Sequence, residues 1–200
     1  MLPLIYTNST AAGIFIAICL VWLVPEMIGA LPQLAKNSRK TVLVQDRSSM
    51  AILIGLQWTG LALNFALAWW FPAAAILWQR TAFFVLGLAC IPVGVTLRWY
   101  AIRTLGRFFT RDVAVSVDQP VVQSGPYRLI RHPAYSGTFL TMLGVGLATT
   151  NWASLICLLV CVFAGHFYRV SIEEKALVHT LGQPYVDYMR RTRRFIPLLF

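Results

Sequence analysis

Five long apolar runs, separated by short polar or basic stretches, make up most of the chain. They cover about residues 10–34, 50–71, 81–102, 134–150 and 152–168. A hydrocarbon core about 30 Å thick is crossed by a helix of roughly 17–25 apolar residues. Each run therefore predicts a membrane-spanning helix. The last two runs are the shortest and are joined only through residues 150–152, which predicts a tight antiparallel hairpin.

The composition agrees with this pattern. Of the 200 residues 58% are hydrophobic and only 12% are charged, against about 25% charged residues in soluble domains. The first ten residues contain no lysine or arginine, so they lack the charged region of a secretory signal, and the first run is expected to be kept as a span. The fold class predicted is an all-α integral membrane protein of about five transmembrane helices, with residues 1–200 in one domain.

The basic residues predict an orientation. Of 17 lysine and arginine residues, four lie between the first two runs, six flank or lie between the third and fourth, and six follow the fifth, which leaves Arg80 on the other side. The positive-inside rule then places the N-terminus outside and the C-terminus in the cytoplasm, with a cytoplasmic loop at 103–132 and a tail at 169–200. The net charge of +10 follows from this bias, and no nucleic-acid partner is expected.

The stretch QSGPYRLIRHPAYSG, residues 123–137, concentrates polar chemistry before the fourth run. Pro133 suits the first position of a helix, which puts His132 at or next to the N-cap. Free N–H groups in that first turn, together with the helix dipole, favour an anion. Tyr127 and Tyr135 are expected to face one another across a small concavity. An alternative interpretation is that these tyrosines and arginines only anchor the protein at the membrane interface.

A second cluster lies in HFYRVSIEEKAL, where the fifth run continues as a helix. His166, Arg169 and Glu173 are spaced so that they share one helical face. Glu174 is turned about 100° away, and we interpret Glu174 and Lys175 as an ordinary charged pair on a solvated helix. The hairpin brings the two clusters to the same side of the membrane and predicts a site there.

The chemistry of this site limits its ligand. It offers an anion-binding helix end, aromatic walls, a carboxylate and an arginine. The sequence has no metal-ligand constellation, no Gly-rich phosphate loop and no hydrolase triad, and its four cysteines lie inside apolar runs as structural residues. A zwitterionic ligand with an aromatic base and a cation, such as S-adenosylmethionine, would suit it.

Two motifs together carry a family resemblance. They are G-x-Y-x-x-x-R-H-P-x-Y-x-G at 125–137 and R-x-x-x-E-E-x-x-L followed by G-x-x-Y-x-x-Y at 169–188. Their order and distance resemble the isoprenylcysteine carboxyl methyltransferase family, over roughly residues 105–197. Five spans also agree with its small prokaryotic members, which implies a bacterial or archaeal cell membrane.

The resemblance implies a membrane methyltransferase that uses S-adenosyl-L-methionine without a Rossmann fold. It assigns Arg169 to the substrate as the catalytic residue. Many relatives have a histidine where this chain has Gln119-Pro120, so contact there is expected from the backbone. The implied cofactor contacts are Gln119, Val121, Val122, Tyr127, His132, Pro133, Ala134, Tyr135 and Glu173.

Three functions stay open at this point. The first is methylation of a carboxylate on a lipophilic, prenylcysteine-like acceptor. The second is methylation of a phospholipid amine or a small thiol, for which His166 or Glu174 would be the nearest base. The third is a non-enzymatic membrane protein, such as a transporter subunit or lipid-binding factor, in which the basic loops only anchor.

Overall fold

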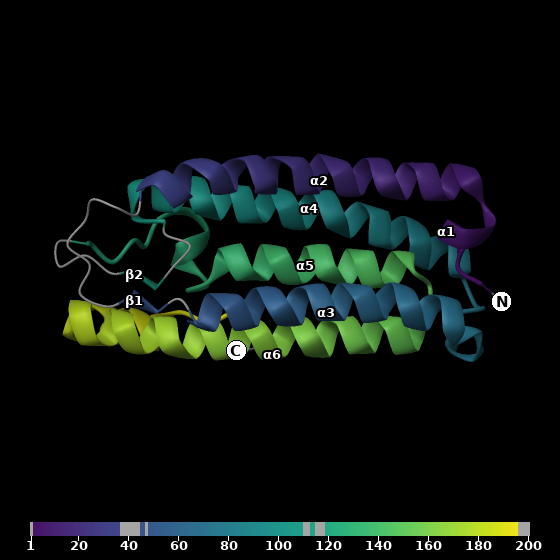
Figure 1. Ribbon diagram of the computed structural model, residues 1–200. Helices are drawn as coiled ribbons and strands as arrows, with labels where there is room; N and C mark the ends of the chain where they lie inside the picture. Colours follow the sequence, from purple (N-terminus) through teal and green to yellow (C-terminus); the bar gives the residue numbers. More distant parts are fainter. Residues whose placement is uncertain (1, 37–44, 47, 110–112, 115–118, 196–200) are drawn as a thin grey trace.

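The computed structural model is a bundle of long helices lying side by side (Figure 1). It describes residues 2–36, 45–46, 48–109, 113–114 and 119–195. The helices are α1 (Leu4–Thr7), α2 (Ser9–Lys36), α3 (Ser48–Trp70), α4 (Arg80–Leu105), α5 (Pro133–Ala148), α6 (Trp152–Leu181) and α7 (Gln183–Arg191). Single 3-10 turns are η1 (Pro72–Ala74), η2 (Gly106–Phe108) and η3 (Gly125–Arg128). One antiparallel pair joins β1 (Gln45–Asp46) to β2 (Val113–Ala114).

A long helix occupies each of the five predicted runs. In the described part of the chain, three helices are long and apolar enough to cross a membrane: α3, α4 with the turn that follows it, and α6. Within α2, the segment Ser9–Val24 is a shorter apolar stretch. α6 continues far beyond the predicted end of its run, so the predicted tail from Arg169 begins inside a helix. The protein is an all-helical membrane protein with three to four apolar helices, apart from the short β1–β2 pair.

The outer surface of the bundle is apolar. Large side chains such as Val21, Trp58 and Trp70 are 60–78% exposed, which in water would form patches that soluble monomers avoid. Some residues used for the predicted orientation, and the end of the predicted tail, lie outside the described residues: Arg39, Lys40, Arg47, Arg111 and residues 196–200.

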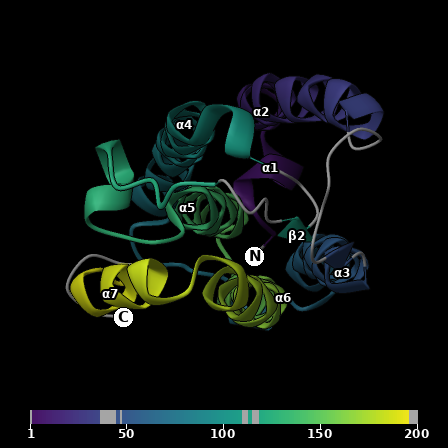
Figure 2. The ribbon, with the colours of Figure 1, turned by 90° about the vertical axis from the view of Figure 1, so that its left-hand side faces the viewer.

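α5 lies at the centre of the bundle, between α4 and α6, as the end-on view shows (Figure 2). Glycines allow α4 and α5 to approach closely. A Cβ atom at Gly94 would lie 2.6 Å from the carbonyl oxygen of Gly137, and one at Gly144 would lie 2.6 Å from that of Gly87. Each helix thus presents two glycines seven residues apart to the other. Such small-residue contacts are a common way to pack helices in membranes.

The hairpin between α5 and α6 is fixed by polar side chains. Asn151 caps α6 by accepting a hydrogen bond from Ser154 N at 3.0 Å, and its amide donates to the carbonyl of Phe71 at 2.9 Å. Thr149 donates to Asn64 of α3 at 3.2 Å. Because Asn151, Thr149 and Asn64 are fully buried, these bonds hold the antiparallel pair against α3. The predicted tight hairpin is confirmed.

The C-terminal segment returns to the start of α5. Arg131 N donates to Arg193 O at 2.7 Å, His132 N to Arg194 O at 3.1 Å, and Arg193 N to Leu129 O at 3.2 Å. These bonds run in parallel along the two segments. Backbone pairing therefore holds the residues after α7 over the beginning of α5 and the middle of α6.

Candidate active site

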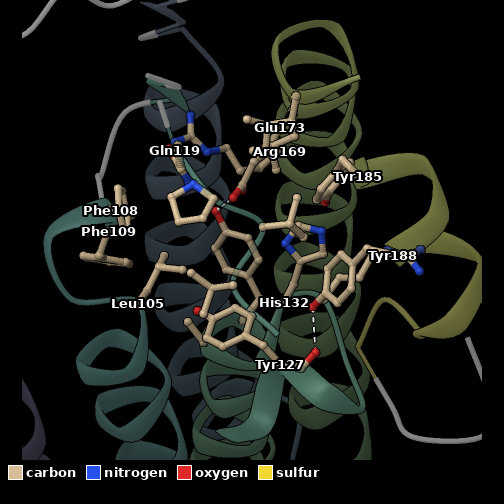
Figure 3. A pocket seen from close by; sticks show the side chains of 18 residues that line it. Leu105, Phe108, Phe109, Gln119, Tyr127, His132, Arg169, Glu173, Tyr185 and Tyr188 are labelled. Atoms are coloured by element: carbon tan, nitrogen blue, oxygen red, sulfur yellow. Dashed lines mark hydrogen bonds between the residues drawn. The ribbon is translucent and has the colours of Figure 1, made fainter. Parts of the chain in front are cut away.

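A cavity lies at one end of the bundle, where α4 ends, α5 begins and α6 passes (Figure 3). Leu105, Phe108 and Phe109 form one side, and Tyr185 and Tyr188 of α7 lie opposite them. The remaining lining residues come from the segment before η3, from η3 itself, from the residues that lead into α5 and its first turn, and from α6. They are Gln119, Pro120, Val121, Val122, Tyr127, Arg131, His132, Ala134, Tyr135, Arg169, Glu173, Leu177 and Leu181.

This cavity brings together nearly all the residues that the sequence assigned to the site. Eight of the nine expected cofactor contacts line it, and so does Arg169. Pro133 is the exception: it is buried at the first position of α5 and does not belong to the lining. That these residues bind a cofactor stays a prediction.

Tyr135 connects the two motifs across the cavity. Its hydroxyl donates to Glu173 Oε2 at 2.9 Å. Its ring stacks on His132, with centroids 5.7 Å apart and planes inclined by 26°. The first turn of α5 and the middle of α6 are thereby held at a fixed separation, with one carboxylate facing the cavity.

Arg169 forms a buried cationic part of the wall. Its side chain is 2% exposed, and its Nη1 donates to Ser49 Oγ at 2.7 Å. It also hydrogen-bonds the side chain of Tyr135. Ser49 lies in the first turn of α3, so a third helix orients this guanidinium. Arg169 and Glu173 are one turn apart on α6 and line the same cavity, as their spacing predicts.

The interpretation of Glu174 as a solvent-exposed residue paired with Lys175 is wrong. Glu174 is buried, with 4% of its surface exposed. Its Oε1 lies 2.8 Å from Arg131 Nε and 3.3 Å from His132 Nε2, and its Oε2 lies 2.8 Å from Arg194 Nη2. The 100° turn from Glu173 directs Glu174 toward the segment that returns after α7, which covers it. Lys175 is exposed, as expected.

The same network holds α7 in place. Arg131 Nη1 donates to the carbonyl of Met189 at 3.0 Å and to that of Thr192. These carbonyls belong to the end of α7, where an arginine satisfies groups that the helix leaves without partners. α7 is also tied to η3, because the hydroxyl of Tyr188 donates to the carbonyl of Tyr127 at 2.8 Å (Figure 3).

Burial keeps the tyrosines of this wall neutral. It raises the pKa of Tyr188 to about 12. It also raises the pKa of Tyr127 and of Tyr185, with the negative charge of Glu173 adding to the effect. These hydroxyl groups therefore act as hydrogen-bond donors and not as bases near neutral pH.

The start of α5 offers fewer free amides than the sequence predicts. His132 is the N-cap and Pro133 occupies the first turn, as expected. However, the N–H groups of Tyr135 and Ser136 both donate to the carbonyl of His132, at 3.0 and 3.1 Å. Because those two amides already have partners, Ala134 is the lining residue through which this helix end can offer an amide.

The two bases suggested for an amine or thiol acceptor do not line the cavity. His166 is 2% exposed and lies beside the rings of Tyr135 and Phe139, and its Nδ1 is 2.8 Å from the carbonyl of Val162. Glu174 is occupied by its cationic partners. Among the described residues, Glu173 is the lining carboxylate.

Sequence reasoning missed part of the wall. Tyr185 and Tyr188 stand in the G-x-x-Y-x-x-Y motif, and their three-residue spacing on α7 was a usable sign that both face one side. Ser49 had no such sign, because it lies 120 residues before Arg169 and contacts it only through the packing of α3 on α6.

Comparison with known proteins identifies the family. The phospholipid methyltransferase family model matches residues 82–184, which is just over half of the chain and contains α4 except its first two residues, all of α5 and α6, and most of the cavity. The chain belongs to the phospholipid methyltransferase family.

Individual relatives agree with the resemblance carried by the two motifs. The chain is 32% identical to protein-S-isoprenylcysteine O-methyltransferase B of Arabidopsis thaliana over 131 residues, which are 64% of this chain and 65% of the plant protein. It is 29% identical to the Saccharomyces cerevisiae protein-S-isoprenylcysteine O-methyltransferase over 117 residues, 58% of this chain and 49% of the yeast protein. The chain thus spans less than two thirds of the length of these relatives.

A solved structure is also similar. The eukaryotic intramembrane Ras methyltransferase, an isoprenylcysteine carboxyl methyltransferase, matches with a TM-score of 0.54 and 29% identity. The match covers 78% of this chain and 55% of that one. The resemblance expected from the motifs, and the intramembrane fold that it implied, are confirmed.

Proposed function

We propose that this protein is a membrane methyltransferase that transfers a methyl group from S-adenosyl-L-methionine to a carboxylate of a lipophilic, prenylcysteine-like acceptor. One observation carries the proposal: Arg169 and Glu173, one turn apart on α6, line a single cavity together with aromatic side chains and residues 119–122. The relatives, whose names state isoprenylcysteine O-methylation, support this choice of acceptor.

The residues present fit the proposed cofactor. The Glu173 carboxylate accepts hydrogen bonds and favours a cationic neighbour, as an amino group or sulfonium requires. Tyr127, Tyr188 and Leu105 supply the apolar and aromatic surface on which an adenine packs. The cavity holds about 110 Å³, less than the roughly 300 Å³ at the lower end of ligand pockets. We therefore expect the cavity to widen when the cofactor binds.

The residues of this chain orient the two reactants and supply the positive charge that binds the acceptor carboxylate. S-adenosyl-L-methionine, when bound, supplies an electrophilic methyl group on a sulfonium. Arg169 binds the acceptor carboxylate and orients one oxygen toward that methyl group, which removes the entropic cost of alignment during the reaction. A carboxylate is already ionised at neutral pH because its pKa is near 4. No general base is required, which agrees with the position of His166 and Glu174 outside the lining.

The proposed topology has five spans in one domain, with α2, α3, α4, α5 and α6 crossing the membrane of a prokaryotic cell. The N-terminus lies outside and the cavity opens on the cytoplasmic side. The basic residues around the cavity end of the bundle, such as Arg103, Arg128 and Arg190, support this orientation through the positive-inside rule.

Ligand binding and methyl transfer test this proposal separately. The full chain, purified in detergent, is heated with S-adenosylmethionine or its demethylated product, and both are expected to raise the unfolding temperature. Labelled methyl transfer is then measured to an N-acylated S-farnesylcysteine, to phosphatidylethanolamine and to a small alkyl thiol. We expect a base-labile methyl ester on the farnesylcysteine alone. Absence of stabilisation by either nucleoside would refute the methyltransferase, whereas methylation of the amine or the thiol would refute the acceptor.

A further inference from the structure

A second hollow lies on the outer surface of the bundle, between α5 and α6. Its volume of about 800 Å³ is within the roughly 300–1,000 Å³ of ligand pockets. Phe139, Leu143, Val160 and Phe163 are among its lining residues. The groove extends from Ser136 to Leu143 along α5, about 10 Å at 1.5 Å per residue. A groove of this length can hold the first part of a lipid acyl chain, next to the lipid headgroup.

Charge is confined to one end of this groove. Arg194 lines it beside Phe167, with the guanidinium carbon 5.5 Å from the ring centroid. Its side chain keeps 33% of its surface exposed while it pairs with Glu174. The single carboxylate of Glu174 is shared by two guanidinium groups, those of Arg131 and Arg194. The network therefore carries an excess positive charge at the mouth of an apolar groove.

The groove is separate from the cavity of the candidate active site. The two have no lining residue in common. Tyr135 lines the cavity, Phe139 lines the groove, and the buried ring of His166 contacts both. Rings that contact one another thus connect the lining of the groove to that of the cavity, and because the two linings share no residue we assign the groove an occupant other than the acceptor of methyl transfer.

We propose that this groove binds one acyl chain of an anionic phospholipid from the surrounding membrane, with the headgroup phosphate on Arg194. The excess positive charge favours a net negative headgroup, because the ammonium group of a zwitterionic lipid would be repelled at the same place. The apolar walls, with three exposed or partly exposed phenylalanines, keep the chain in hydrocarbon surroundings. The exposed Arg193 beside Arg194 adds a second positive charge at that end.

The position of Arg194 couples this lipid to the cavity wall. Arg194 Nε and Nη2 both contact Glu174 Oε2, at 3.0 and 2.8 Å, and Glu174 also holds Arg131 and His132. A phosphate on Arg194 adds a negative charge to a network that has a cationic excess. The lipid is thus expected to stabilise the folded bundle and the segment after α7, residues 192–195, which carries Arg194.

Lipid-dependent stability of the full, delipidated protein in detergent tests this inference. Phosphatidylglycerol is expected to raise the unfolding temperature by several degrees more than phosphatidylcholine with the same acyl chains. Val160→Trp fills the groove at a position that is 63% exposed, and it should lose this difference. Val85→Trp, at a 56% exposed position of α4 outside the groove, is its matched control and should keep it. Ala164→Trp on α6 and Ala62→Trp on α3 form a second pair if Val160→Trp does not fold.

The headgroup contact is tested by Arg194→Gln, which keeps a hydrogen-bond donor for Glu174 but removes the charge. It should respond equally to both lipids, whereas Arg194→Lys should retain the preference for phosphatidylglycerol. After phosphatidylglycerol is added back, native mass spectrometry should detect one bound molecule of this lipid on the wild type and none on Val160→Trp. Equal stabilisation of the wild type by the two lipids, an unchanged response of the groove-filling variants, or displacement of the lipid by a farnesylcysteine would each overturn the proposal.

Discussion

Arg131 and Glu174, 43 residues apart in the sequence, form a buried ion pair with 2.8 Å between Nε and Oε1. The pair joins the residue before the N-cap of α5 to the middle of α6. Through Arg131 it also reaches the end of α7, and through Arg194 it reaches the segment that returns over the site. Glu174 does not line the cavity. It determines where the elements that do so lie.

Glu174→Gln should therefore destabilise the protein strongly. The change leaves Arg131 and Arg194 buried or half-buried without their carboxylate, and removing one partner of a buried pair costs about 3–5 kcal/mol. Thermal or denaturant unfolding in detergent measures the loss. Lys175→Gln is the matched control, because Lys175 is the adjacent residue and is exposed. A Glu174→Gln variant as stable as Lys175→Gln would show that this network does not hold the fold.

Substitution of Glu173 is expected to weaken cofactor binding, whereas substitution of Glu174 is expected to weaken the fold. Glu173→Gln removes the carboxylate that faces the cavity and accepts the Tyr135 hydroxyl. We expect it to lower the affinity for S-adenosylhomocysteine by at least tenfold, while its unfolding temperature without ligand stays within a few degrees of the wild type. Calorimetric titration with S-adenosylhomocysteine measures the affinity. Unchanged affinity would remove Glu173 from the cofactor site.

Arg169→Lys should separate binding from turnover. Lysine keeps the positive charge but lacks the planar fork that holds a carboxylate through two parallel bonds. We expect kcat with a farnesylcysteine acceptor to fall by about 100-fold, roughly 2.7 kcal/mol at about 1.36 kcal/mol per factor of ten, with binding of S-adenosylhomocysteine retained. Ser49→Ala removes the hydrogen bond that orients Arg169 and should lower kcat by a smaller factor, again with S-adenosylhomocysteine binding retained. Full activity of Arg169→Lys would contradict the assignment of the acceptor carboxylate to this residue.

The sequence predicted the parts of this structure that local patterns determine. Apolar length located α3 and α4 to within a few residues, and the short link at residues 150–152 located the hairpin. Glu174 was misinterpreted because its burial depends on the pairing of residues 193–194 with 129–132, and a backbone contact between distant segments leaves no periodic signal. Ser49 was missed for the same reason. Arg169 and Glu173 were found because their helical spacing and the hairpin are both local features.

The close contact between α4 and α5 depends on glycine at Gly94 and Gly137. Gly94→Ala would place a Cβ atom 2.6 Å from the carbonyl oxygen of Gly137, so the two helices would have to separate. Overpacking of this kind costs typically 1–3 kcal/mol, and we expect a fall in unfolding temperature. Gly55→Ala is the matched control on α3, where an added Cβ would meet nothing within 4 Å. It should be neutral or stabilising, since alanine is favoured over glycine inside a helix by roughly 0.5–1 kcal/mol. If the two variants unfold at the same temperature, the close glycine approach does not determine how α5 is packed, and the position of His132 at its start must depend on other contacts.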